Sequence, residues 1–284
     1  MTDLLQIAVL SAIAIACGLL GPFLVLKRMT LFANALSHTL LLGVALAFLI
    51  TGSSLFHLPN LLIGALLAAL MTALFTGGLT RIFRLQEDAS IGLVFTALFA
   101  LGIVVVTLYT RDAHLGIEAV MGNADVLQGS DLKLALGLAG LNLAAVLLFF
   151  RQLQLTSFDP NLAKTMGIRS GFFHFLLLFL AAATCIGAFR AVGVLLVLAF
   201  LVGPFLIARL FCDRLPKLLV WSPLIGVGAS AAGVGISRIC LDLFGWALST
   251  GGIVTSLIGV GYVAALLYSR IIHKLHPCAK KFPS

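Results

Sequence analysis

Charged residues are scarce in this chain of 284 residues: Asp, Glu, Lys and Arg together make up 10% of it, while 61% is hydrophobic. The mean hydropathy is +1.18. A soluble domain has about a quarter charged and about half apolar residues, so this composition excludes an ordinary soluble protein. The sequence therefore predicts an all-α polytopic membrane protein, with little chain left for a soluble domain.

The chain also lacks the motifs of several enzyme classes. It contains no G-x-x-x-x-G-K-[ST] phosphate loop and no Gly-Lys pair, so it shows no sign of hydrolysing ATP itself. No H-E-x-x-H or G-x-S-x-G arrangement is present, and the five cysteines are scattered without metal-ligand spacing. The acidic residues lie almost wholly at predicted span ends, which disfavours a proton relay. We expect neither an enzyme activity nor a tightly bound cofactor.

Apolar windows of about 20 residues identify eight or nine membrane spans, and nine is the preferred count. The candidate spans are 5–26, 31–51, 60–80, 89–110, 131–150, 171–189, 191–208, 218–237 and 250–269. The longest polar connections between them are 111–130 and 151–170. We therefore expect one transmembrane domain over residues 1–284.

The Lys and Arg residues are distributed unevenly between the two ends of these spans. If the N-terminus lies outside, fourteen of the eighteen fall on the inner side and only Arg111, Lys133, Arg190 and Arg238 on the outer side. Cytoplasmic loops of membrane proteins carry such an excess of positive charge. The sequence therefore predicts an outside N-terminus and a cytoplasmic C-terminus. The same bias explains the net charge of +8, which is no sign of nucleic-acid binding.

His38 lies inside the apolar stretch 31–51, which begins just after a charged pair of residues. If the helix is continuous from Arg28, ten residues at ~1.5 Å each place His38 near the middle of a ~30 Å hydrocarbon core. An ionisable residue at that depth indicates function. Asn34 lies four residues earlier and so on the same helix face, where the two side chains could bind a metal ion. The alternative is a packed histidine bonded to a backbone carbonyl of a neighbouring helix.

The connection 151–170 is the one sizeable amphiphilic insert on the predicted cytoplasmic side. Asp159 suits an N-cap, Pro160 the first helical position and Gly167 the C′ position. This pattern predicts a short helix of about two turns outside the membrane. Because so short a helix is marginal in water, we expect it to dock on another surface. A simple connector helix at the membrane interface is the alternative.

Glu87 and Asp88 open the fourth predicted span. Carboxylates are favoured at a helix N-terminus by the helix dipole, which is sufficient reason for their position. They could also contact Arg or Lys residues of a cytoplasmic partner. The sequence leaves both interpretations open.

Four stretches resemble, in order, the signatures of membrane permeases from bacterial ABC importers for manganese, zinc and iron. They are GPFLVLKRMTLFANALSHTLLLGVALAF (21–48), EDASIGLVFTALFALGIVVV (87–106), SFDPNLAKTMGI (157–168) and GVLLVLAFLVGPFLIAR (193–209). The resemblance implies the ABC importer permease fold and a transmembrane subunit that carries a divalent transition metal across the bacterial inner membrane. A self-contained secondary metal-ion transporter is the alternative.

The resemblance also implies partners. Such permeases pair with a second permease and leave the translocation path between them. A cytoplasmic ATPase subunit uses ATP on their behalf, and a periplasmic metal-binding protein delivers the ion. The segment 157–168 resembles the cytoplasmic coupling helix, which sits in a groove of the ATPase, with Asp159, Ala163 and Gly167 at the matching positions.

Members of that family usually carry Asp at the position of Asn34, in a D-A-L-S-H motif whose Asp and His resemble path-lining metal ligands. His38 matches this motif and Asn34 departs from it. A carboxylate offsets the charge of a dication, whereas an amide supplies only a dipole. The departure favours a heterodimer with a different permease that retains the carboxylate, over a homodimer. The metal stays open, since imidazole suits zinc or iron and oxygen ligands suit manganese.

Overall fold

The computed structural model describes residues 2–27, 29–51, 58–83, 85–109, 127, 129–245 and 249–275, and their regular structure is entirely helical. The helices are α1 (Thr2–Leu26), α2 (Thr30–Thr51), α3 (Leu58–Ile82), α4 (Glu87–Tyr109), α6 (Gly129–Phe158), α7 (Pro160–Thr165), α8 (Ser170–Val192), α9 (Val194–Phe211), α10 (Leu215–Phe244) and α11 (Thr250–Leu275). Each predicted span falls on a long helix, except that 191–208 begins within the last residues of α8 and that residue 110, the end of 89–110, lies outside the described residues. Over the described ranges, seven helices are long and apolar enough to cross a membrane. A multi-pass, all-helical protein is thus confirmed, and the count of nine spans stays a prediction.

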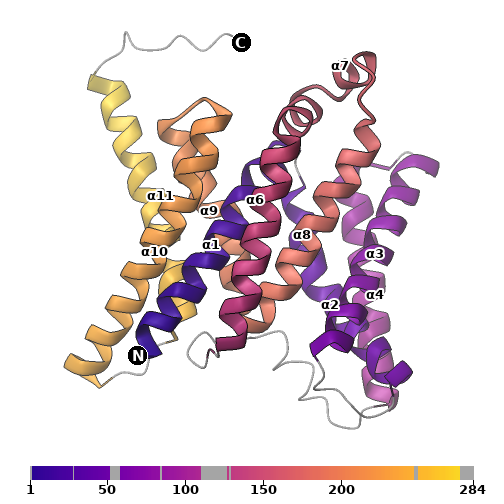
Figure 1. Cartoon of the computed structure of the whole chain (residues 1–284), viewed down its shortest axis with the longest axis horizontal. Coiled ribbons are helices and arrows are strands. Elements are labelled where there is room, and N and C mark those ends of the chain that lie inside the picture. The colour runs from indigo at the N-terminus through magenta and orange to yellow at the C-terminus, as the bar shows by residue number, and fades with distance from the viewer. Residues whose placement is uncertain are drawn as a thin grey trace.

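Helix α1 lies at the centre of the bundle, between α10 and α11 on one side and α8 on the other (Figure 1). It packs against α6, α8, α9 and α10. Its large side chains Leu10, Leu20 and Phe23 are fully buried. A helix that is apolar on every side belongs in such an interior position.

Close backbone contacts hold α1 against its neighbours. A Cβ atom added at Gly21 would overlap the carbonyl oxygen of Leu201 in α9. A Cβ atom added at Gly18 would lie 2.9 Å from the backbone nitrogen of Pro223 in α10. In a membrane, where lipid is as apolar as the protein, small residues that allow such close packing supply much of the attraction between helices.

A buried polar cluster joins α1, α6 and α8 in the middle of the bundle. The Asn142 side chain is fully buried, and its Nδ2 donates to the carbonyl oxygen of Ala16 at 3.1 Å and to Thr184 Oγ1 at 2.8 Å. The Thr184 hydroxyl in turn donates to the carbonyl oxygen of Leu180 at 2.7 Å. Hydrogen bonds between transmembrane helices contribute about 0.6–2 kcal/mol each, so this cluster supports the close packing around α1.

Helices α2, α3 and α4 pack on one another and form an arm at the side of the bundle (Figure 1). This α2–α4 arm has a small core of its own around Leu42, Val94 and Leu98. It meets the rest of the bundle mainly through contacts of α2 and α3 with α8. Met29 and Phe32 at the start of α2 belong to the main core, which anchors the arm at that end.

The amphiphilic insert 151–170 differs from the prediction in its first half. Helix α6 continues through the predicted end of the span to Phe158, with a bend at Phe149 (φ −114°, ψ 19°). Leu153 and Thr156 are buried three residues apart on this extension, so it keeps an inward face beyond the apolar window. The separate helix α7 is therefore six residues long, close to the two turns expected.

Candidate functional site

Helix α7 projects from one end of the bundle, between the end of α6 and the start of α8 (Figure 1). Asp159 is its N-cap, and one carboxylate oxygen, Oδ1, accepts the backbone N–H groups of Asn161 at 2.9 Å and Leu162 at 3.0 Å. Pro160 follows in the first turn, where its missing N–H costs nothing. The predicted start of the helix is confirmed.

The C-terminal end of α7 is closed by a Schellman motif. The N–H of Gly167 donates to the carbonyl of Lys164 at 3.0 Å, and the N–H of Ile168 donates to the carbonyl of Ala163 at 2.9 Å. Gly167 has a φ of +78°, a left-handed conformation that glycine adopts without a steric penalty. The predicted C′ position of Gly167 is confirmed, and both ends of α7 are locally fixed.

The outward side of α7 carries large apolar side chains beside the exposed Asn161, Lys164 and Thr165. Ala163 is fully buried against the bundle and fixes the helix in place, whereas Leu162 is 48% and Met166 57% exposed. Phe158, just before the N-cap, is 61% exposed. We call Phe158, Leu162 and Met166 the α7 surface. Large apolar side chains held outward on a rigid, capped element at a polar end of the bundle are typical of a protein-binding site.

His38 lies in the α2–α4 arm, on the side of α2 that faces α4. Its half-buried ring lies 5.5 Å from the ring of Phe95 and 5.3 Å from that of Phe99, measured between centroids. Asn34, one turn earlier on the continuous helix α2, is exposed. Within the described residues, no group of three or more His, Cys, Asp or Glu side chains gathers into a metal centre. The chain thus offers one imidazole and one amide on α2.

Helix α4 begins at Glu87, as predicted, and the side chain of Asp88 is exposed. The backbone N–H of Ser90 donates to the carbonyl of Gln86 at 2.9 Å, which completes the first turn. Ile91 of α4 and Pro160 of α7 line one common hollow, so the start of α4 lies at the same end of the bundle as α7.

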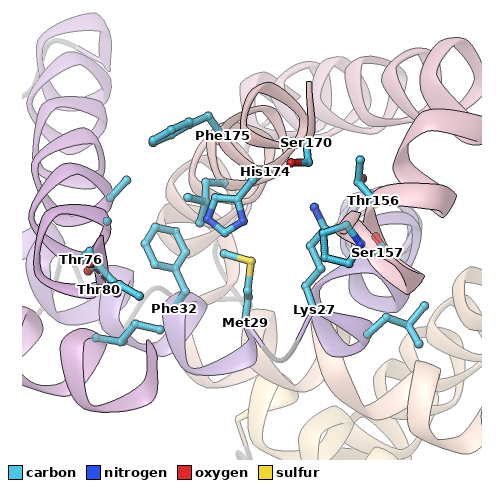
Figure 2. Close-up of a pocket in the computed structure, with 17 residues that line it drawn as sticks. Lys27, Met29, Phe32, Thr76, Thr80, Thr156, Ser157, Ser170, His174 and Phe175 are labelled. Carbon is cyan, nitrogen blue, oxygen red and sulfur yellow. Dashed lines mark hydrogen bonds between the residues drawn. The ribbon is translucent and has the colours of Figure 1, made fainter. Parts of the chain in front are cut away.

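That hollow, which we call the α7 pocket, has a volume of about 470 Å³. Lys27, Ser157 and His174 are among its polar lining residues (Figure 2). Sequence reasoning missed it, because its residues come from α1, α2 and the connection between them and from α3, α4, α6, α7 and α8. A histidine four residues into an apolar span was the one local signal, and it was not singled out.

Long apolar helices packed around a buried central helix define a polytopic membrane protein. The chain belongs to the ABC 3 transport family, whose model matches residues 1–269. The resemblance drawn from the sequence motifs is therefore confirmed, and an ABC importer permease is favoured over a self-contained secondary transporter.

Relatives with similar sequences extend over most of the chain. A probable metal transport system membrane protein of Chlamydia muridarum is 38% identical over 266 residues, which cover 93% of this chain and 84% of the relative. The manganese transport system membrane protein MntD of Bacillus subtilis is 35% identical over 272 residues (90% and 88%). The chelated iron transport system membrane protein YfeD of Yersinia pestis is 35% identical over 269 residues (94% and 86%).

Solved structures show the same fold. A chain of PsaBC from Streptococcus pneumoniae in complex with Fab superposes with a TM-score of 0.76 at 28% identity, covering 92% of this chain and 89% of that one. A putative metal-chelate type ABC transporter in an inward-facing conformation gives a TM-score of 0.64 at 20% identity, covering 92% and 84%. The ABC importer permease fold is thus confirmed.

Proposed function

We propose that this chain is the transmembrane subunit through which an ABC importer carries a divalent transition metal across the bacterial inner membrane. The family match over residues 1–269 carries this proposal, and the relatives named for manganese and iron transport support the choice of cargo. ATP hydrolysis belongs to a separate cytoplasmic subunit. A periplasmic metal-binding protein delivers the ion to the opposite end of the bundle.

In this proposal α7 is the coupling helix, and the ATPase subunit binds the α7 surface. Three residues fix this helix in position. The carboxylate of Asp159 caps its N-terminus, the buried methyl group of Ala163 packs against the bundle, and Gly167 closes its C-terminus. A helix fixed at both ends does not fray. A movement of the bound ATPase subunit that displaces α7 therefore also displaces α6 and α8. Glu87 and Asp88, at the same end of the bundle, add negative charge for basic residues of the same partner.

The orientation follows from the same assignment. Helix α1 begins at the end of the bundle opposite α7, and the last helix, α11, ends on the α7 side (Figure 1). Nine spans give this arrangement, with the N-terminus outside and the C-terminus in the cytoplasm. The excess of Lys and Arg on the α7 side supports it.

Asn34 and His38 are the part of the metal path that this chain supplies. Transition metals in proteins commonly take four ligands or more, and an imidazole with one amide oxygen leaves the remainder to other groups. The exposure of Asn34 supports a face of α2 turned toward a second permease. Since an amide cannot offset the charge of the ion, we propose a heterodimer whose other subunit contributes a carboxylate.

Reconstitution into proteoliposomes tests the function. With the second permease, the ATPase subunit and the metal-binding protein present, we expect uptake of Mn²⁺ that requires ATP on the α7 side of the membrane. A Leu162→Asp variant that assembles normally should lose ATP-driven uptake, because the α7 surface then carries a charge. Uphill uptake by the chain without any ATPase subunit would instead establish the secondary transporter.

Co-purification tests the heterodimer. An untagged copy of the full-length chain and a tagged copy are expressed together in cells that lack other permeases of this family. We expect the tagged copy to bring down little of the untagged one until the second permease is supplied. Equal recovery of both copies in an active complex would establish a homodimer.

A further inference from the structure

The α7 pocket lies where the α2–α4 arm meets the rest of the bundle, at the α7 end. Figure 2 shows Met29, His174 and Lys27 next to one another across its middle, with Thr76 on the α3 side and Ser157 on the side of α6. Its lining combines two groups able to carry positive charge with several hydroxyls. No acidic side chain is among the described residues that line it. The pocket therefore suits an anion.

Two hydroxyl groups in this pocket have no hydrogen-bond partner. Thr76, which is only 8% exposed, and Ser157 both present a buried side-chain oxygen that makes no hydrogen bond within the described structure. A buried hydroxyl without a partner is costly, and such groups usually meet a bound molecule or ordered water. Their positions on opposite walls point to one ligand between them.

The pocket continues into an apolar groove of about 250 Å³ between α3 and α8. Phe32, Ala73 and Leu178 line both spaces, and Ala73 lies in α3 at the passage from one to the other. Further residues of the groove, such as Leu70 and Phe179, are wholly apolar. The ligand that fills both spaces has an anionic end and a hydrocarbon end.

We propose that the α7 pocket and this groove form a binding site for one anionic phospholipid. Its phosphate lies near Lys27 and His174 and accepts from the Ser157 hydroxyl, the Thr76 hydroxyl on the opposite wall donates to an ester oxygen of the lipid, and one acyl chain follows the groove between α3 and α8. Basic pockets between transmembrane helices on the cytoplasmic side are suited to lipid headgroups. A free phosphate would leave the groove unfilled, and a zwitterionic lipid would gain less from the cations.

The site has a mechanical consequence. One wall carries Ser157, near the end of α6, and Pro160, the first residue of α7, and the opposite wall is the α2–α4 arm. A lipid held between them fixes the arm and α7 in one relative arrangement. Its presence is a property of the folded membrane chain and does not depend on which metal is carried or on what drives transport.

Photolabelling of the full-length chain tests the site. The protein is purified in mild detergent and irradiated with phosphatidylglycerol that carries a diazirine on its acyl chain. We expect adducts on peptides covering the groove in α3 and α8, for example at Leu70 and Phe179. Unlabelled phosphatidylglycerol should compete, whereas phosphatidylcholine should compete weakly and inorganic phosphate alone should not displace the labelled lipid.

Variants make the test specific. Lys27→Gln should reduce labelling about fivefold, the effect expected for one cation at an anionic lipid. Ala73→Leu, which fills the passage, should abolish the groove adducts. The matched controls are Lys217→Gln, which removes an exposed lysine of α10, and Ala232→Leu, which enlarges an exposed residue of the same helix. Both controls should label like the parent protein.

Thr76→Val is a second variant for the case in which either change impairs folding. It keeps the shape of the side chain and removes the unpartnered hydroxyl, so the lipid-free protein should be no less stable while labelling falls. Unchanged labelling in Thr76→Val and Lys27→Gln, equal competition by phosphatidylcholine, or displacement by inorganic phosphate would each overturn the proposal. Metal uptake is not part of the readout, so a failure here is separate from a failure of the transport function.

Discussion

The imidazole of His38 in α2 lies edge-on against the ring of Phe99 in α4, with centroids 5.3 Å apart and planes inclined by 65°. Aromatic pairs of this geometry contribute about 0.5–1.5 kcal/mol beyond simple burial. His38 thus has a packing role within the α2–α4 arm in addition to the metal role that its membrane depth indicates. A substitution to alanine removes both at once, so other variants are needed to separate them.

His38→Phe separates the two roles. The ring keeps its contacts with Phe95 and Phe99, and the metal-binding nitrogen is lost. We expect assembly and thermal stability close to those of the parent protein and loss of Mn²⁺ uptake in proteoliposomes. Phe99→Leu is the control, since it weakens the packing and should leave uptake measurable. Full uptake by His38→Phe would show that His38 only packs.

Asp159→Ala tests whether the N-cap of α7 is needed for coupling. Loss of an N-cap costs about 1 kcal/mol, because two backbone N–H groups lose their acceptor. We expect the ATPase subunit to remain bound while the number of metal ions moved per ATP hydrolysed falls several-fold. Asp159→Asn, which can still cap, is the matched control. An unchanged ratio of transport to hydrolysis in Asp159→Ala would mean that the rigidity of α7 has no part in coupling.

Gly193→Ala should destabilise the junction of α8 and α9. Gly193 is the single residue between the two helices, and its φ of +81° and ψ of 164° lie in a region that is nearly exclusive to glycine. We expect a loss of about 1–3 kcal/mol, measured as a lower midpoint of unfolding in detergent. Gly137→Ala in α6, where an added Cβ meets nothing within 4 Å, should leave the midpoint unchanged or raise it slightly. Equal midpoints for the two variants would contradict the prediction.

Gly21→Ala should disturb the centre of the bundle. The added methyl group would collide with the backbone carbonyl of Leu201, which cannot rotate away as a side chain could. Helix α9 must therefore move from α1, with an expected cost of about 1–3 kcal/mol for overpacking. Thermal unfolding and the yield of protein that elutes as one species measure it. Gly140→Ala, an open position in α6, provides the comparison.

The sequence predicted well what depends on neighbouring residues along the chain. The apolar windows located the long helices because membrane thickness sets their length. Asp159, Pro160 and Gly167 located α7, since caps are made by residues within one turn of the helix end. The continuation of α6 to Phe158 was missed because burial of Leu153 and Thr156 depends on helices that pack against them, which no apolar window reports.

Sequence alone thus determined that this protein is an all-helical membrane protein with a short capped helix at one end, and its motifs identified the family. Tertiary structure alone decided that α1 is the central helix, that His38 faces the aromatic rings of α4, and that Lys27, Thr76, Ser157 and His174 share one pocket. The physical reason is that helix length and capping are local, whereas the choice of neighbours depends on the fit of side chains from segments far apart in the chain.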